Sequence, residues 1–177
     1  QICCHGEPVF QVMYGEAATI WRINLGERRR KNKQNYGFVL DTERGFWEKQ
    51  ESLVPDNEDV ADPMSAHREK VIPYVTDRRN CLLLKPEKSF SIEQMATLQA
   101  ALKNAIQVYF QLEDNELAVE PLPDSRTRRI LLFYESAEGG AGVLKRLVDE
   151  SDAVQKVVRA ALDICHFDPD TGADRRR

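Results

Sequence analysis

The sequence lacks the short motifs by which common catalytic and nucleotide-binding sites are recognised. It has no Gly-Lys-Ser/Thr of a phosphate loop, no Gly-x-Gly-x-x-Gly and no Gly-x-Ser-x-Gly. These absences argue against an ATPase, a Rossmann dinucleotide site and an α/β-hydrolase. The three histidines, His5, His67 and His166, fall in stretches without regular structure, so none stands out as a catalytic base.

Cysteine is scarce and poorly spaced for a metal site. Four are present, two of them adjacent, and there is no Cys-x-x-Cys. Cys81 lies in an apolar stretch, which predicts a core position. Without a secretory signal we expect reduced thiols. The cysteines are Cys3, Cys4, Cys81 and Cys165.

Long apolar runs and a secretory leader are also missing, so we expect no membrane partner and a cytoplasmic location. The net charge of −4 gives the whole chain no basic footprint for tight nucleic-acid binding. Hydrophobic residues make up 42% of the chain, as in ordinary globular proteins. The first residue is Gln1 and the last residues are a run of arginines, so we expect a piece of a longer protein.

Strand-like stretches come first along the chain. β-Branched and aromatic residues predict extended segments that form a meander, and 46–47 is a possible short partner strand. Two later segments could form a hairpin around 77–79, the first at an edge because of Pro73. The predicted strands are 9–14, 17–25, 36–41, 71–76, 80–85, 116–122 and 129–135.

Helices dominate the second half. Ser91 and Gln94 form a capping-box pattern before a long amphipathic helix, 91–112, whose apolar stripe is most consistent with core packing. A helix over 141–149 and a second one capped by Ser151 follow. The fold class is α/β (or α+β), a mixed sheet with a long amphipathic helix and a C-terminal helix pair. The predicted segments are 1–50, β-rich; 51–68, a polar loop or disordered insert; and 69–177, an α/β domain. The stripe comprises Met95, Leu98, Leu102, Ala105, Tyr109 and Leu112.

The stretch 130–144 is the most informative part of the chain. An apolar strand that ends at Glu135 leads into a turn with Gly139, Gly140 and Gly142 and then into a helix. We expect backbone amides to open outward at this turn, with Glu135 at its mouth, which is a common layout for an anion site. The alternative is a tight connection whose glycines serve packing.

Acidic residues crowd the same end of the predicted sheet. Glu116 opens one strand and Glu135 closes another, so the two would meet if those strands are antiparallel neighbours. Carboxylates on adjacent strands hold Mg²⁺ in nucleases, which makes a metal-dependent nuclease one hypothesis. The alternative is that surface carboxylates simply gather at the ends of elements. The candidate residues are Glu113, Asp114, Glu116, Glu135 and Glu138.

Basic residues form local clusters despite the acidic net charge. Such clusters contact phosphates in nucleic-acid-binding proteins, although many are solvated loops. The candidates for phosphate contact are Arg28, Arg29, Arg30, Lys31, Arg78 and Arg79, and a further cluster comprises Arg126, Arg128 and Arg129.

The C-terminal part of the chain resembles the MrfA-type zinc-binding (MZB) domain, a helicase-associated domain of unknown function. The resemblance covers roughly residues 91–166 and rests on four motifs. This domain occurs in large DEAD/DEAH-box helicases and in helicase-like proteins such as the DrmB-like proteins of DISARM phage defence. The motifs are Thr97-Leu-Gln-Ala-Ala-Leu102, Leu112-Glu-Asp-Asn-Glu-Leu117, Leu131-Leu-Phe-Tyr-Glu-Ser-Ala-Glu-Gly-Gly-Ala-Gly142 and Ala160-Ala-Leu-Asp-Ile-Cys165.

The resemblance implies an accessory module of a helicase-like protein in phage defence or DNA repair. Its expected partners are DNA, bound weakly, and the helicase core or a partner subunit. It implies a zinc site of four cysteines, of which only Cys165 can be carried over, so we expect no cofactor in these 177 residues. ATP would be used only by the parent protein's motor domain. A purely structural docking domain is the remaining alternative.

Overall fold

The computed structural model describes residues 1–27, 34–48, 67–137 and 139–176. These residues form two compact units, one made of residues 1–20 and 77–177 and the other of residues 21–76. The division differs from the predicted segments because residues 1–20 join the sheet of the C-terminal half. Of the predicted insert 51–68, all but His67 and Arg68 lies outside the described residues.

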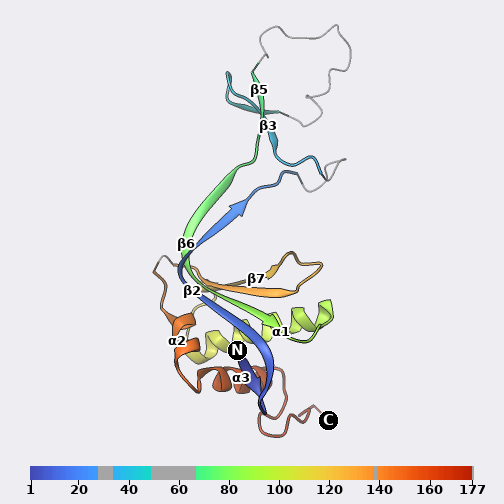
Figure 1. The fold of residues 1–177 in the computed structure, drawn as a ribbon, viewed down its shortest axis with the longest axis vertical. Coiled ribbons are helices and arrows are strands. Elements are labelled where there is room, and N and C mark those ends of the chain that lie inside the picture. The colour runs from blue at the N-terminus through green and yellow to red at the C-terminus, as the bar shows by residue number, and fades with distance from the viewer. Residues whose placement is uncertain (28–33, 49–66, 138, 177) are drawn as a thin grey trace. The chain divides into compact units, whose positions relative to one another are not determined.

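The larger unit is built on a five-stranded sheet in the order β1-β2-β6-β8-β7 (Figure 1). The pairs β1–β2, β6–β8 and β7–β8 are antiparallel, so the arrangement is α+β, and these pairs show no parallel component of the expected mixed sheet. No helix in the described parts of the chain is long and apolar enough to cross a membrane. The strands are β1 (Ile2–Cys4), β2 (Glu7–Ile23), β6 (Tyr74–Pro86), β7 (Leu117–Leu122) and β8 (Ile130–Glu135).

Strand β8 lies between β6 and β7 and is hydrogen-bonded on both edges. Leu131 pairs with Leu84 of β6 and with Pro121 of β7, and Leu117 opposes Glu135 at the far end. Leu131 and Phe133 are almost completely buried. The strand therefore holds its last residue, Glu135, in a fixed and enclosed position.

Strands β2 and β6 are longer than the sequence suggested. The predicted hairpin around 77–79 is wrong, because β6 runs without a break through these residues beside β2. Segment 9–14 and residues 17–23 of the segment 17–25 likewise belong to one strand, with Ala17 at a positive φ of 47°. A neighbouring strand supplies backbone partners to polar residues that would otherwise favour a turn.

Helix α1 (Ile92–Phe110) begins as predicted. The Ser91 hydroxyl accepts the Gln94 N–H, and the Gln94 side chain accepts the Ser91 N–H, which completes the capping box. The predicted stripe packs on the core, with Met95 and Ala105 buried. Gln107, which the sequence placed outside the stripe, is also buried, and its Nε2 donates to the Glu113 carbonyl at 3.2 Å.

The C-terminal helix pair comprises α2 (Val143–Asp149) and α3 (Ala153–Ile164). The predicted cap at Ser151 is wrong, since Asp152 occupies the N-cap of α3 and makes no side-chain cap hydrogen bond. Ser151 lies in the turn that the Ala153 N–H closes on the Glu150 carbonyl.

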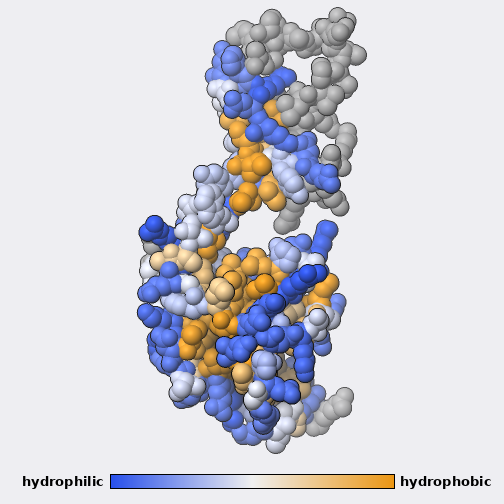
Figure 2. Space-filling view, in the orientation of Figure 1, coloured by the Kyte–Doolittle hydropathy of each residue, from blue (hydrophilic) through white to orange (hydrophobic). Residues whose placement is uncertain are grey.

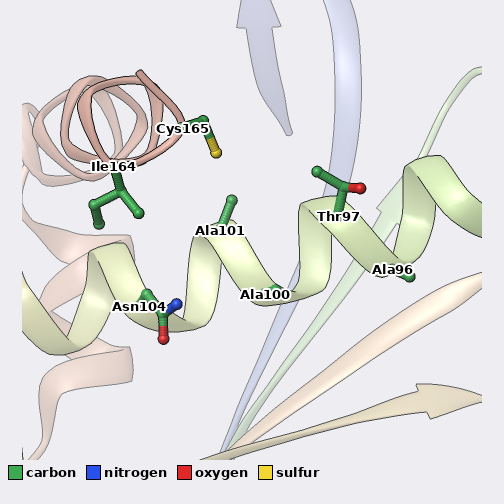
Figure 3. A pocket seen from close by; sticks show the side chains of 7 residues that line it. All are labelled: Ala96, Thr97, Ala100, Ala101, Asn104, Ile164 and Cys165. Atoms are coloured by element: carbon green, nitrogen blue, oxygen red, sulfur yellow. The ribbon is translucent and has the colours of Figure 1, made fainter. Parts of the chain in front are cut away.

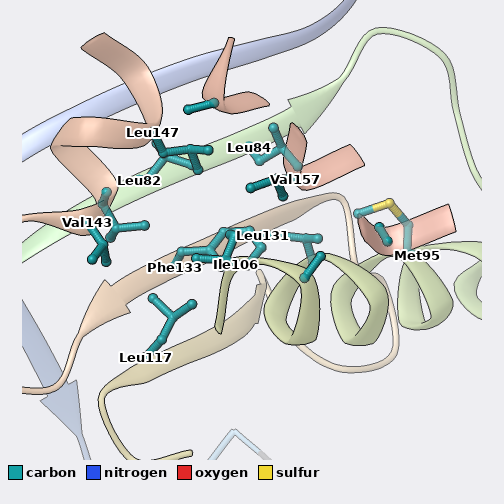
Figure 4. Close-up of a cluster of buried hydrophobic side chains, with 14 residues drawn as sticks. Leu82, Leu84, Met95, Ile106, Leu117, Leu131, Phe133, Val143, Leu147 and Val157 are labelled. Carbon is teal, nitrogen blue, oxygen red and sulfur yellow. The ribbon is translucent and has the colours of Figure 1, made fainter. Parts of the chain in front are cut away.

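The hydrophobic core lies between the sheet and the helices (Figure 4). It draws on every helix and on strands β6, β7 and β8, so these elements stabilise one another through shared apolar burial. The buried core residues are Leu82, Leu84, Met95, Ala105, Ile106, Leu117, Leu131, Phe133, Val143, Leu144, Leu147, Ala153, Val157 and Ala161.

The smaller unit contains a three-stranded sheet in the order β4-β3-β5. Strand β3 (Phe38–Asp41) pairs antiparallel with β4 (Phe46–Glu48) and with β5 (Arg68–Val71). The partner strand expected at 46–47 is present as β4. The buried Asp41 carboxylate accepts the N–H groups of Glu43 and Arg44 at 3.0 Å each, which holds the turn and keeps the pKa of Asp41 below its usual range.

Two adjacent valines of α3 provide a test of this packing. Val157 is 3% exposed in the core and Val158 is 44% exposed. We expect Val157→Ala to lower the free energy of unfolding by about 2 kcal/mol, since it removes buried methyl groups and leaves a cavity. Val158→Ala removes the same groups from the same helix and should change stability by less than about 0.5 kcal/mol. Urea denaturation measures both, and equal effects would contradict the packing.

Candidate functional site

The chain turns from sheet into helix between Glu135 and Val143, as the sequence predicts. All three glycines of the turn have positive φ, of 81° at Gly139, 56° at Gly140 and 70° at Gly142. Gly142 is the N-cap residue of α2 and makes no side-chain cap bond. Left-handed backbone is most easily adopted by glycine, so these residues shape the turn.

The Glu135 carboxylate accepts hydrogen bonds from backbone amides at the N-terminus of helix α2. The side chain is 2% exposed, and its oxygens accept the Gly142 N–H at 3.0 Å and the Leu144 N–H at 2.9 Å. A negative charge here satisfies amides that the helix cannot pair and interacts with the positive end of its dipole. The expectation of outward-facing amides with Glu135 at the mouth of the turn is therefore wrong for these two amides, because they are occupied from within.

Asn80 connects this turn to the rest of the sheet, a role that its sequence pattern did not indicate. The side chain is 8% exposed. Its Nδ2 donates to Glu135 Oε2 at 3.1 Å and to the Gly139 carbonyl at 3.2 Å, and its Oδ1 accepts the Ala17 N–H at 3.1 Å. One amide thus connects β2, β6, the end of β8 and the glycine turn. The sequence feature that could have pointed to Asn80 is its place as a polar residue at the start of the apolar run Asn80-Cys-Leu-Leu-Leu84.

Gly140 lies against the Glu135 side chain. A Cβ at this position would overlap Glu135 Oε2 and would lie 2.7 Å from Glu135 Cδ. Apart from its chain neighbours, no described residue places an atom within 4 Å of a Cβ built at Gly139 or Gly142. The close approach of backbone to carboxylate therefore requires glycine at position 140 for space as well as for φ.

The buried carboxylate also acts on nearby ionisable groups. Burial raises the pKa of the Cys81 thiol, and the charge of Glu135 adds to that shift. The pKa of Tyr14 is raised by burial first and then by Glu16, Glu135 and Asp149. Both shifts favour the neutral form of the group, which suits a structural environment better than nucleophilic chemistry. Cys81 lies in the core, as predicted.

The acidic residues of the nuclease hypothesis are placed at neighbouring strand ends. The strands are antiparallel neighbours, and the Ser136 N–H donates to the Glu116 carbonyl at 2.8 Å. The Glu116 and Glu135 carboxylates, however, accept hydrogen bonds from different backbone groups. The exposed Glu116 accepts the Glu113 N–H at 2.7 Å, whereas Glu135 accepts N–H groups of the glycine turn and α2. Asp114 is exposed in the same turn. Glu138 lies outside the described residues, which contain no group of three His, Cys, Asp or Glu placed to hold a metal ion.

The basic candidates fall into two groups. Arg28, Arg29, Arg30 and Lys31 lie outside the described residues. On β6, Arg78 is exposed, whereas the Arg79 side chain is 18% exposed and its Nη2 lies 3.5 Å from Asp77 Oδ2. Within the described structure Arg78 is therefore the more accessible of this pair.

Cys165, the one residue carried over from the zinc site of the family, caps the end of α3. It is partly buried and lines a groove of about 440 Å³ with Ile164 and small side chains of α1 (Figure 3). A tetrahedral zinc site needs four ligands, and the described residues place no second and third ligand beside this thiol. They do not fit a zinc ion. The α1 residues of the groove are Ala96, Thr97, Ala100, Ala101 and Asn104.

The segment after Cys165 is organised by one carboxylate. Asp168 Oδ1 accepts the N–H groups of Asp170 and Thr171 and the Thr171 hydroxyl, and Arg175 contacts its second oxygen. These donors, the Thr171 N–H first, lower the pKa of Asp168 to about 2. Arg175 also pairs with Asp163 of α3 at 2.6 Å, which ties the turn to the helix.

Replacing Glu135 by its amide tests the role of the buried carboxylate. Glutamine has one acceptor oxygen where the site presents three N–H donors, so Glu135→Gln should leave a buried donor unpaired. We expect a loss of about 1–3 kcal/mol in the free energy of unfolding. Glu120→Gln, at an exposed position of β7, is the control and should change it by less than about 0.5 kcal/mol. Chemical denaturation with matched m-values provides the measurement.

A second test separates space from backbone conformation at the turn. Gly142→Ala places a Cβ in open space at positive φ and should cost about 1–2 kcal/mol. Gly140→Ala adds the overlap with the carboxylate, so we expect a loss of about 3 kcal/mol or more. Thermal unfolding of the two variants side by side checks the order, and a Gly142→Ala protein that is the less stable of the two would refute the geometry.

Comparison with known proteins identifies the region that contains this turn. No curated protein matches the chain. A similar solved structure is the crystal structure of MrfA, a DUF1998 helicase bound to DNA, with 11% identity and a TM-score of 0.44. The match covers 96% of this chain and 24% of that one, so the chain spans about a quarter of the length of that helicase. Residues 98–169, from α1 through the glycine turn to the segment after α3, match the family model of the MrfA Zn-binding domain, MZB. The similarity to the MZB family thus covers most of the long helix, the glycine turn and the C-terminal helix pair.

Proposed function

We propose that this chain is an accessory module of a helicase-like, DNA-processing protein and has no catalytic activity of its own. The observation that carries the proposal is the match of residues 98–169 to the MZB family. The chain offers no phosphate-loop motif, so ATP hydrolysis would belong to a motor domain of the parent protein. Phage defence and DNA repair are the processes in which such a parent would act.

The geometry of the glycine turn supports a scaffold role. Its buried carboxylate is satisfied by Gly142, Leu144 and Asn80, so the group is engaged in holding the fold. A rigid junction of this kind can present other surfaces to the helicase core or to a partner subunit. The described carboxylates of the nuclease hypothesis give no support to metal-dependent cleavage.

Contact with DNA would come from the basic residues. Five of the six residues 28–33 are Arg or Lys, and Arg78 is exposed on β6. Cations of this density neutralise phosphates and release counterions, which gives weak binding that does not depend on sequence. The residues proposed for phosphate contact are Arg28, Arg29, Arg30, Lys31, Arg78 and Arg79.

The salt dependence of DNA binding tests the proposal. We expect the 177-residue chain to bind a fluorescein-labelled oligo(dT) at low salt, with an affinity that falls as salt rises. Arg28→Ala/Arg29→Ala should weaken binding and make the slope of log K against log salt shallower by about 0.7 for each phosphate contact that is lost. Fluorescence anisotropy between low and physiological salt provides the measurement.

Lys85→Ala/Lys88→Ala is the matched control, since it removes the same charge from two exposed positions near the end of β6. It should leave both the affinity and the slope nearly unchanged. If the two double variants behave alike, the effect is one of net charge and the assigned residues are wrong. If the chain does not bind DNA even at low salt, the DNA contact is disproved and a docking role remains.

A further inference from the structure

A ribbon of two strands in the smaller unit exposes apolar side chains on one face. The Asn24 N–H donates to the Pro73 carbonyl at 2.9 Å, which places the end of β2 beside the start of β6. Side chains alternate along strands, so Trp21 and Ile23 share a face with Tyr74 across the pair. Leu25 and Ile72 lie just beyond the ends of these two strands and are 46% and 45% exposed. We refer to Trp21, Ile23, Leu25, Ile72 and Tyr74 as the aromatic ribbon.

The two rings of the aromatic ribbon are stacked and open to solvent. The centroids of Trp21 and Tyr74 lie 4.8 Å apart with an angle of 29° between the planes. Trp21 is 57% exposed, Tyr74 58% and Ile23 53%. Figure 2 shows hydrophobic surface on this unit. Exposed aromatic and aliphatic side chains that adjoin one another mark an interaction site more often than a free surface.

The sequence that follows Leu25 of the aromatic ribbon indicates which partner the ribbon fits. None of its five residues is acidic, and the sequence after Glu27 carries five positive charges in six residues. An apolar protein partner would match the rings but would gain nothing from these cations. Duplex DNA would match the cations, but its base faces are stacked against one another. Single-stranded DNA offers both phosphates and free base faces.

We propose that the aromatic ribbon is a stacking platform for single-stranded DNA, with bases packed on Trp21 and Tyr74. This inference rests on the DNA contact proposed above and adds the residues that hold the bases. The aliphatic neighbours, Ile23 first among them, would cover the edge of a stacked base. Because every base has a π-face, the platform would hold DNA without sequence preference.

Ring removal is the first test, on the 177-residue chain with labelled oligo(dT) at low salt. Trp21→Ala and Tyr74→Ala should each weaken binding on the order of 10-fold, since stacking on one aromatic ring contributes about this much per base. The salt slope should stay as in the wild type, because no phosphate contact is removed. Circular dichroism and the melting temperature verify that each variant folds.

The chain contains a matched control in its second tryptophan. Trp47 of β4 is 60% exposed in the same unit but packs edge-on against Phe38, outside the aromatic ribbon. Trp47→Phe should keep the affinity within about twofold, and Trp21, then the sole tryptophan, should lose fluorescence when oligo(dT) binds. In Trp21→Phe the remaining Trp47 should show no such change. These measurements leave the ribbon's backbone and most of its surface intact.

The outcomes separate this inference from the function on which it rests. If binding depends on salt but both ring variants bind with unchanged affinity, the stacking platform is disproved and the basic contact is retained. No binding by the wild-type chain overturns both. Self-association of the wild-type chain that Trp21→Ala abolishes would assign the aromatic ribbon to a second copy and overturn the DNA platform. Weaker binding in the ring variants, together with quenching of Trp21, establishes it.

Discussion

A buried carboxylate that accepts the amides of a helix start is the interaction on which the C-terminal half of this chain depends. Glu135 ends the central strand, and the same side chain satisfies the first turn of α2 and receives the amide of Asn80. Strand, turn and helix therefore cannot shift independently. A negative charge enclosed in the fold is stable only while these donors stay in place, so the sheet and the helix pair must form together.

Much of this architecture was predictable because it follows from local pattern. The capping box at Ser91 and Gln94, the apolar stripe of α1 and the buried run of β8 were each identified correctly. The failures share a cause. Residues 77–79 look like a turn but are extended, because strand pairing overrides the local preference of polar residues. The direction of the Glu135 side chain was equally hidden, since it depends on Asn80, 55 positions away in the sequence.

The glycine turn suggests an anion-binding site, but the structure gives it a role in holding the fold together. Strand, acid, glycines and helix form a layout that binds anions in many proteins, and here the anion is the protein's own side chain. A site already filled in this way contributes rigidity. The surfaces that we propose for recognition lie elsewhere. They include the stacked rings of Trp21 and Tyr74, which sequence pattern alone could not pair because the two residues belong to different strands, β2 and β6.

The path of the chain through β2 and β6 has a consequence for how this molecule could vary. Residues 21–76 leave the larger unit along one strand and return along its hydrogen-bonded neighbour. The segment thus has the connectivity of an insertion between two adjacent positions of a host sheet. A short turn joining those positions would close an ordinary hairpin and leave the host's core residues untouched. Residues 21–76 can therefore be lengthened, exchanged or deleted in evolution while the host domain keeps its fold.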